Sequence, residues 1–137
     1  MPTSPMPTNK DIITAIFAET AKGNGRPYVE ALADNATFRT IGSGAWSGTF
    51  RGKDAILKEI FGSLRNKLEG RNTCIPTRIH ADGDYVIVQA NGRNRTKDGR
   101  DYNNDYCFVI RMENGKMVAI EEYCDTELVT SVLGERV

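Results

Sequence analysis

The sequence predicts an α+β fold in which N-terminal helices cover a long antiparallel sheet. Two observations predict this class. Apolar residues recur at helical spacing in the first half of the chain, whereas the second half consists of β-rich runs separated by tight-turn sequences. Strands joined by tight turns form an antiparallel meander, and helices that precede a meander are typical of α+β proteins.

One domain accounts for the length of 137 residues. Three prolines among the first seven residues indicate a flexible tail over residues 1–8, so the single domain is expected over residues 9–137. No apolar run reaches the roughly 20 residues needed to span a bilayer, and the start of the chain lacks the features of a secretory signal. The sequence therefore indicates a cytoplasmic protein with no membrane partner.

Three helices are expected in the first half of the chain. The first begins at Thr8 or Asn9, which suit a helix N-cap, and ends before Gly23. The second is short and covers residues 27–33, and the third covers about 53–68. The apolar stripes of the first and third helices comprise Ile12, Ile13, Ile16, Phe17 and Ala21, and Ile56, Leu57, Ile60, Phe61, Leu64 and Leu68.

The strands follow from the turn sequences. After a turn at Asp34-Asn35, residues 36–41 are expected to form a short strand, and residues 42–52 a glycine-rich loop around Trp46. Three tight-turn sequences follow and separate β-rich runs over about 72–81, 84–96, 101–112 and 117–124. A last helix is expected after Asp125, which suits its N-cap.

Charge and cysteine content exclude several functions. Lys plus Arg and Asp plus Glu both total 18, so a globally basic nucleic-acid binder is disfavoured. The basic cluster over residues 93–100 lacks stacking aromatics and is interpreted as a solvated hairpin tip. Three widely spaced cysteines and a single histidine, His80, predict neither a disulfide framework nor a metal site.

Strand alternation predicts which side chains face the helices. In the run over 101–112, Asn104, Tyr106, Phe108, Ile110 and Met112 share one mostly apolar face, which we assign to the interior.

The same reasoning, applied to the last strand, points Val118 and Ile120 inward and carries Glu122 with them. A carboxyl held in an apolar cavity has a raised pKa and can exchange a proton near neutral pH. A bulge would instead turn Glu121 and Tyr123 inward. In the alternative without a functional role, Glu122 pairs with an arginine or lies at a solvent-exposed end of the strand.

Five short segments together resemble SnoaL-like proteins of the nuclear transport factor 2-like superfamily. They are residues 46–56 (WSGTFRGKDAI), 82–88 (DGDYVIV), 99–106 (GRDYNNDY), 113–117 (ENGKM) and 121–125 (EEYCD). Each segment alone is weak, but the order of elements agrees over roughly residues 9–134. The combination is more specific for the fold than for an activity.

The resemblance implies a cone, in which a curved antiparallel sheet wraps around the helices as a cystatin-like α+β barrel and encloses a pocket. The superfamily includes ketosteroid isomerases, polyketide cyclases, limonene epoxide hydrolases, scytalone dehydratases and non-catalytic binders. Many members are homodimers that pair through the outer face of the sheet, so a homodimer is expected, with outward Val109 and Tyr123. None needs a redox cofactor, and most use acidic residues in the cavity.

One activity in the superfamily is excluded by the residues present. Ketosteroid isomerases carry a tyrosine on the first helix and an aspartate base on the short strand, where this chain has Ile16 and Thr40. Epoxide hydrolases use an aspartate before a tyrosine on the closing strand, which Glu122 before Tyr123 resembles. SnoaL-type cyclases use a late acidic residue, which either Glu122 or Asp125 matches.

Two functions are the main hypotheses. In the first, an enzyme isomerises, cyclises or hydrolyses a small, largely apolar organic molecule, and Glu122 or Asp125 moves a proton. Asn104 and Tyr106 then orient an oxygen of the ligand, while Trp46, Tyr28 and Phe38 line the cavity. In the second, the same pocket binds a ligand or supports dimerisation without turnover. A role in nucleic-acid binding is the weakest hypothesis.

Overall fold

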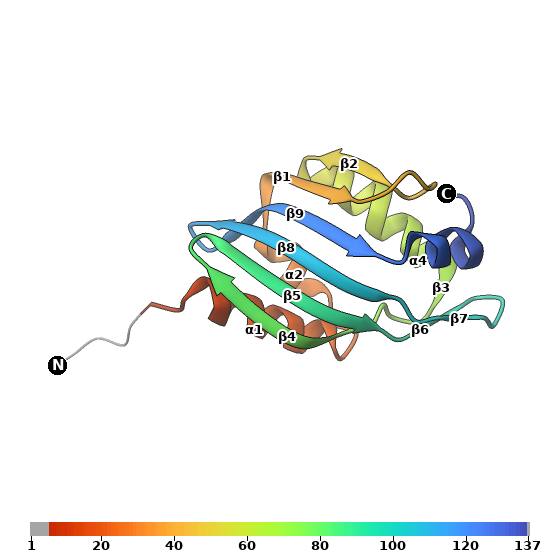
Figure 1. The fold of residues 1–137 in the computed structure, drawn as a ribbon, viewed down its shortest axis with the longest axis horizontal. Coiled ribbons are helices and arrows are strands. Elements are labelled where there is room, and N and C mark those ends of the chain that lie inside the picture. Colours follow the sequence, from red (N-terminus) through yellow and green to blue (C-terminus); the bar gives the residue numbers. More distant parts are fainter. Residues whose placement is uncertain (1–5, 137) are drawn as a thin grey trace.

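A six-stranded sheet in the order β2-β1-β9-β8-β5-β4 dominates the computed structural model, which describes residues 6–136 (Figure 1). Its strands are β1 (Leu32–Thr40), β2 (Gly48–Arg51), β4 (Cys74–Asp82), β5 (Tyr85–Gly92), β8 (Asp105–Glu113) and β9 (Lys116–Cys124). The predicted α+β class is confirmed. Residues 1–5 of the predicted tail lie outside the described residues.

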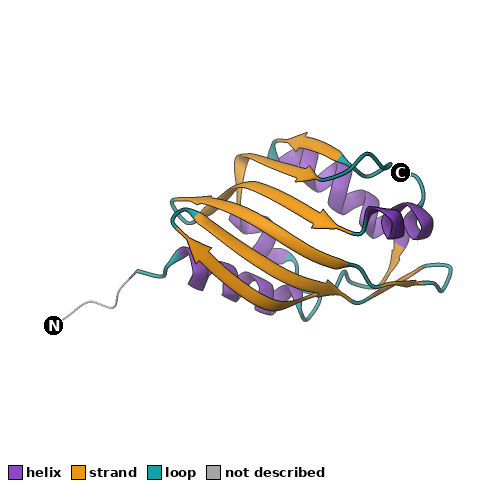
Figure 2. Ribbon diagram, in the orientation of Figure 1, coloured by secondary structure: helices purple, strands orange, loops and turns teal. Residues whose placement is uncertain are grey.

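Helices cover one face of this sheet (Figure 2). They are α1 (Asn9–Thr20), α2 (Arg26–Ala31), α3 (Lys53–Ala55), the π-helical segment η1 (Ile56–Gly62) and α4 (Ser63–Lys67). The last three are continuous and form the expected third helix. Thr8 caps α1 through a reciprocal pair of hydrogen bonds with Asp11, of 3.0 and 3.1 Å, as its position before the apolar stripe predicted.

The sheet differs from the predicted barrel in two respects. β1 and β9 pair in parallel, whereas the other neighbouring strands of this sheet are antiparallel. The sheet is also open, since β2 and β4 are its edges and do not pair with each other. The reason is that α1 packs against β4 while η1 packs against β2, so helices occupy the space between the two edges.

Three local predictions need correction. No turn occurs at Asp34-Asn35, because β1 begins at Leu32 and absorbs an irregularity in its pairing before Thr37. The glycine-rich loop contains strand β2. Each of the two long runs 84–96 and 101–112 is broken in two. The pieces β6 (Asn94–Thr96) and β7 (Asp101–Tyr102) join β3 (Leu68–Glu69) in a separate three-stranded sheet.

The buried apolar side chains form two clusters. The larger cluster lies between the helices and the six-stranded sheet and includes Phe17, Phe38, Val88, Ile110 and Ile120. The smaller cluster joins the small sheet to the C-terminal helical turns α5 (Thr126–Leu128) and η2 (Val129–Leu133). Its buried members are Trp46, Leu68, Tyr102, Val129 and Leu133.

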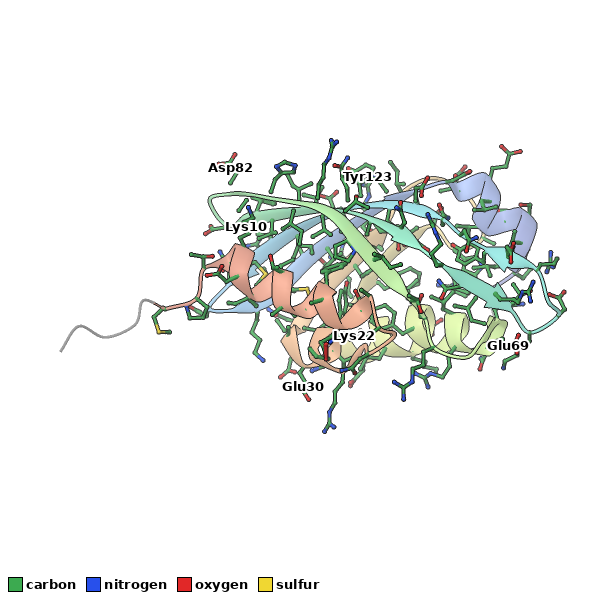
Figure 3. The ribbon with its side chains drawn as sticks, turned by 90° about the horizontal axis from the view of Figure 1, so that it is seen from below. Lys10, Lys22, Glu30, Glu69, Asp82 and Tyr123 are labelled. Atoms are coloured by element: carbon green, nitrogen blue, oxygen red, sulfur yellow. The ribbon has the colours of Figure 1, made fainter. Side chains whose placement is uncertain are left out.

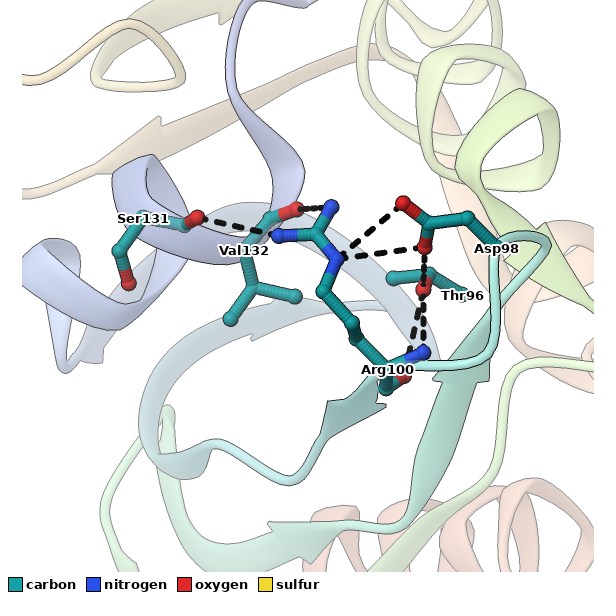
Figure 4. A network of polar contacts seen from close by, with 5 residues as sticks. All are labelled: Thr96, Asp98, Arg100, Ser131 and Val132. Atoms are coloured by element: carbon teal, nitrogen blue, oxygen red, sulfur yellow. Dashed lines mark hydrogen bonds and ion pairs between the residues drawn. The ribbon is translucent and has the colours of Figure 1, made fainter.

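Arg100 ties the β6–β7 hairpin to the last helix (Figure 4). Its guanidinium donates to the backbone oxygens of Val132 at 2.7 Å and Ser131 at 3.3 Å, and it pairs with Asp98 at 3.2 Å. Asp98 in turn accepts a hydrogen bond from the Thr96 hydroxyl. The basic hairpin tip is therefore only partly solvated, since one of its arginines stabilises the C-terminal end of a helix.

The outer face of the sheet carries no helix in the described part of the chain. Tyr123 and Asp82 lie on that side, opposite Lys22 and Glu30 on the helical side (Figure 3). Val109 is half-buried there and Tyr123 is exposed, as alternation predicted. The homodimer expected through this face stays a prediction.

Candidate functional site

A cavity of about 440 Å³ lies between the helices and the concave face of the sheet. It is lined by α1, α2, η1 and α4 on one side and by β1, β8 and β9 on the other. Most of its wall is apolar or aromatic, and its aromatic residues are Phe17, Tyr28, Phe38, Phe61, Tyr106 and Phe108. A hollow of this size and lining suits a small organic ligand.

A second depression, of about 460 Å³, opens broadly to solvent between α1, α2 and the β8–β9 turn. Its ionisable side chains already have partners. Asp11 caps α1, Glu30 pairs with Arg26 at 3.0 Å, and the Lys116 ammonium donates to the Glu30 carbonyl oxygen at 2.8 Å. We therefore take the first cavity as the candidate site.

Glu122 reaches the cavity wall because of the register of β9. It pairs with Phe108 of β8, and Ile120 pairs with Ile110, so all of these side chains share the inward face. The prediction that Val118 points inward is wrong, because the pairing shifts there and buries Met117 instead. The shift ends before Ile120 and leaves Glu122 inside.

The alternative register, with Glu121 and Tyr123 inside, does not occur. The Glu121 carboxylate pairs with the Arg39 guanidinium at 2.9 Å on the outer face of the sheet. Tyr123 is exposed on the same face. One side chain of the Glu-Glu-Tyr run thus faces the cavity, and its neighbours on either side face away from it.

Burial raises the pKa of the Glu122 carboxyl from its ordinary value of 4.5 to about 7. The Thr40 hydroxyl opposes this shift, because it donates to Oε2 of Glu122 at 3.3 Å. Thr40 is buried and lies opposite Glu122 in the parallel β1–β9 pair. The parallel pairing of β1 with β9 thus places Thr40 where it can donate a hydrogen bond to the Glu122 carboxyl. Local sequence does not reveal this pairing.

Three further ionisable side chains surround Glu122. Burial, with the Glu122 charge as a smaller cause, raises the pKa of Tyr28 and Tyr106 and raises that of the Cys74 thiol to about 12. All three groups are therefore neutral near pH 7. The two tyrosine hydroxyls are hydrogen-bond donors that face the same space as the carboxyl.

Tyr106 has a fixed orientation. Its ring stacks on Phe108 with centroids 5.3 Å apart, and its hydroxyl donates to that of Tyr102 at 3.4 Å. The ring also passes over Gly92, where an added Cβ would lie 3.0 Å from Cε2 of Tyr106. By contrast, the Tyr28 hydroxyl makes no hydrogen bond with any residue between 6 and 136, which leaves it available to a ligand.

Asn104 and Asp125, two of the predicted site residues, do not line the cavity. Asn104 is completely buried, and it uses its amide to bind the backbone nitrogen and oxygen of Asp125 at 3.0 and 3.1 Å. Asp125 is exposed, and its carboxylate caps the last helix by accepting from the Leu128 nitrogen at 3.1 Å. Asn104 therefore fastens the end of β9, and Asp125 starts the helix that follows.

Trp46 also lies away from the cavity. It packs in the smaller cluster, and its indole nitrogen donates to the Gly134 oxygen at 2.8 Å. The loop before β2 folds onto the C-terminal helix because that hydrogen bond satisfies the buried indole N–H. Of the seven predicted site residues, the structure brings together Glu122, Tyr106, Tyr28 and Phe38.

The family model for the SnoaL-like domain matches residues 13–120. The chain belongs to this family. No curated protein sequence matches the chain significantly.

Solved structures share the fold of this SnoaL-like protein. An NTF2-like protein from Burkholderia thailandensis has a TM-score of 0.80 and 23% identity, with 93% of this chain and 98% of that chain covered. TerC, co-crystallised with polyporic acid, has a TM-score of 0.75 and 21% identity, with 91% and 97% covered. A Jannaschia protein described as a SnoaL-like polyketide cyclase has a TM-score of 0.75 and 13% identity, with 98% and 97% covered.

Sequence reasoning missed four residues that line or contact the site of the SnoaL-like protein. Thr40 contacts Glu122, and Cys74, Arg65 and Arg71 line the cavity. The available signal was the place of Thr40 on the short strand, where ketosteroid isomerases carry their aspartate base. Within residues 6–136, no group of three or more His, Cys, Asp or Glu side chains is arranged to hold a metal ion, and no helix is long and apolar enough to cross a membrane.

Proposed function

We propose that this SnoaL-like protein is an acid/base enzyme that moves a proton within a small, largely apolar organic molecule. The observation that carries the proposal is the Glu122 carboxyl, which lines a mostly apolar cavity and has a pKa of about 7. At neutral pH both its protonated and ionised forms are populated, so it can take a proton in one step and return it in the next.

The groups around Glu122 support isomerase or cyclase chemistry. As a carboxylate, Glu122 would remove a proton from a carbon next to a ligand carbonyl group, and as an acid it would return the proton elsewhere on the same molecule. The Tyr28 hydroxyl is a neutral donor without a partner among residues 6–136 and would stabilise the oxyanion formed in between, and Tyr106 would add a second donor by turning its hydroxyl from Tyr102 to the ligand. The description of one fold relative as a polyketide cyclase agrees with this reaction class.

Binding without turnover is the second candidate function. The single carboxyl among the described residues that line the cavity disfavours hydrolysis, which commonly needs separate groups for water and for the leaving group, and a mostly apolar cavity also suits binding alone. The two candidates differ in a measurable way, because only the enzyme exchanges protons with its ligand.

Hydrogen–deuterium exchange tests the proposal. The protein is incubated in D₂O with a panel of neutral apolar ketones, and deuterium uptake next to the carbonyl is followed by NMR. We expect catalysed uptake, reduced roughly 100- to 10,000-fold in Glu122→Gln. Asp125→Asn is the matched control, because it removes an acidic charge outside the cavity and should leave the rate unchanged.

Two outcomes would overturn the enzyme proposal. One is an unchanged rate in Glu122→Gln. The other is ketone binding, detected by thermal stabilisation of the protein, without any deuterium uptake, which would establish the binding function instead. A ¹³C NMR titration of the glutamate carboxyls, assigned with the same variant, provides an independent measurement. A pKa near 4.5 for Glu122 would contradict its proposed role.

A further inference from the structure

Two arginines line the outer part of the cavity. Arg65 lies on α4 and Arg71 lies between β3 and β4, and both side chains are exposed. Neither forms an ion pair with a carboxylate among residues 6–136, although five other arginines do, namely Arg26, Arg39, Arg95, Arg100 and Arg111. The mouth of the cavity therefore carries two positive charges without counter-ions in the described chain.

The backbone holds Arg71 against the end of α1. An added Cβ at Gly23 would lie 2.9 Å from Cβ and 3.4 Å from Cδ of Arg71, so the close approach of the two segments requires glycine. Gly23 also has a φ of +80°, which favours glycine for a second reason. The aliphatic stem of Arg71 is thus packed against Gly23, while the residue as a whole is exposed and lines the cavity.

The two ends of the cavity differ in charge. The other ionisable groups on its wall are Tyr28, Cys74 and Tyr106, which are neutral, and Glu122. Burial raises the pKa of Glu122 and the Thr40 hydroxyl lowers it, with no contribution from an arginine. Arg65 and Arg71 are therefore separate from Glu122 and do not serve as its counter-ions.

We propose that the ligand is an apolar, ring-bearing organic carboxylate, whose carboxylate binds Arg65 and Arg71 at the mouth while its apolar body reaches Glu122. A guanidinium presents paired N–H donors that match the two oxygens of a carboxylate. The aromatic wall accommodates the rings, and the volume of about 440 Å³ suits a molecule of this kind. The proposal rests on the proposed function for the chemistry at the inner end only.

Calorimetry with two probes of equal shape tests the anion site. The probes are 4-biphenylcarboxylate and 4-biphenylcarboxamide, which differ in charge but hardly in size. We expect the carboxylate to bind at least about tenfold more tightly than the amide, with a preference that weakens at higher salt. The preference should fall in Arg65→Gln and in Arg71→Gln and disappear in the double variant.

Arg78→Gln is the matched control. Arg78 is also exposed and its replacement changes the net charge equally, but it lies on β4 and does not line the cavity. The carboxylate preference should survive in this variant. Because all three arginines are exposed, denaturation midpoints are expected to remain close to that of the wild type, which confirms that each variant is folded.

Equal affinity for the two probes, no saturable binding of either, or a preference that persists in the double variant would overturn the anion site. Failure of this proposal is distinguishable from failure of the proposed function. Deuterium uptake by neutral ketones depends on Glu122 and does not require the arginines. If the protein prefers the carboxylate probe but catalyses no deuterium uptake, the anion-site proposal stands and the enzyme proposal is wrong.

Discussion

The two apolar clusters of this protein contain similar residues but have different roles. The larger cluster surrounds a cavity whose wall includes one carboxyl, whereas the smaller cluster is filled by Trp46 and the C-terminal helix. At one end of the molecule in Figure 1, α4, the small sheet and the last helix close together over the smaller cluster. The candidate cavity lies beside the larger cluster, between the helices and the six-stranded sheet.

The contrast is sharpest for two acidic residues three positions apart. Glu122 lies at the wall of the cavity, and Asp125 caps a helix in contact with solvent. Both were predicted as acid/base residues from the same short segment. The comparison teaches that an acidic residue near a pocket takes its role from the element in which it lies, here a strand for one and a helix start for the other.

The largest expected effect tests whether the smaller cluster is a structural core. Trp46→Ala should lower the free energy of unfolding by about 3–5 kcal/mol, because it leaves a cavity and removes the hydrogen bond to Gly134. Urea denaturation measures this loss, and Trp46→Phe should recover most of it. If Trp46 bordered a ligand pocket instead, the loss would be below about 1 kcal/mol.

The next effect concerns Glu122 and pH. Its pKa is about 7 in the folded protein and 4.5 ordinarily, so the folded state binds more protons in this interval. The contribution of Glu122 to the free energy of unfolding is therefore constant below about pH 4.5. It falls by up to about 3 kcal/mol as the pH rises to 7, and it then levels off.

Glu122→Gln should remove this pH dependence and be the more stable protein above pH 7. Urea denaturation between pH 5 and 8 compares the two proteins, after subtraction of the slope shared by both. Asp125→Asn should retain the wild-type profile, because Asp125 is exposed. Parallel profiles for the wild type and Glu122→Gln would mean that the carboxyl is solvated and that the two clusters do not differ as described.

A smaller effect is expected at Asp125. Asp125→Ala should cost about 1 kcal/mol, because the nitrogen of Leu128 loses its acceptor, and ligand binding in the cavity should be unaffected. Asp125→Ser keeps an acceptor at the cap and should restore most of the stability. A loss of deuterium exchange in Asp125→Ala, with the fold intact, would return this residue to the list of catalytic candidates.

The smallest effect sharpens the role of Thr40. Thr40→Val removes the hydroxyl that donates to Glu122 and so should raise the pKa of that carboxyl further, while Thr40→Ser should leave it near 7. The ¹³C titration proposed above measures both variants. A lower pKa in Thr40→Val would show that the hydroxyl does not stabilise the charged form.

Local sequence signals predicted most of the strand order. Asn114 and Gly115 both adopt positive φ in the turn between β8 and β9, as the Glu-Asn-Gly-Lys sequence implied. Alternation along β8 predicted the inward face of Phe108 and Ile110 correctly. With the β8–β9 hairpin in place, the inward orientation of Glu122 followed from the apolar residue two positions before it.

Long-range pairing was beyond such signals. The parallel contact of β1 with β9 leaves no pattern in either strand, and therefore neither the Thr40 contact nor the open edges of the sheet could be predicted. Trp46 was ambiguous because a tryptophan in a loop can cover a pocket or a core equally well. The shift at Val118 is one extra residue in a strand, which hydrophobic alternation alone does not reveal.

The contact between Thr40 and Glu122 also has a consequence for folding kinetics, because the two residues are 82 positions apart in the chain. Closing so long a loop is slow, because the chain loses entropy before the contacts between β1 and β9 stabilise it. We expect the meander of β4, β5, β8 and β9 to assemble first and β1 to dock late. Newly made chains would then expose the apolar side of β1 for a time, and they would acquire affinity for a ligand only in the last step.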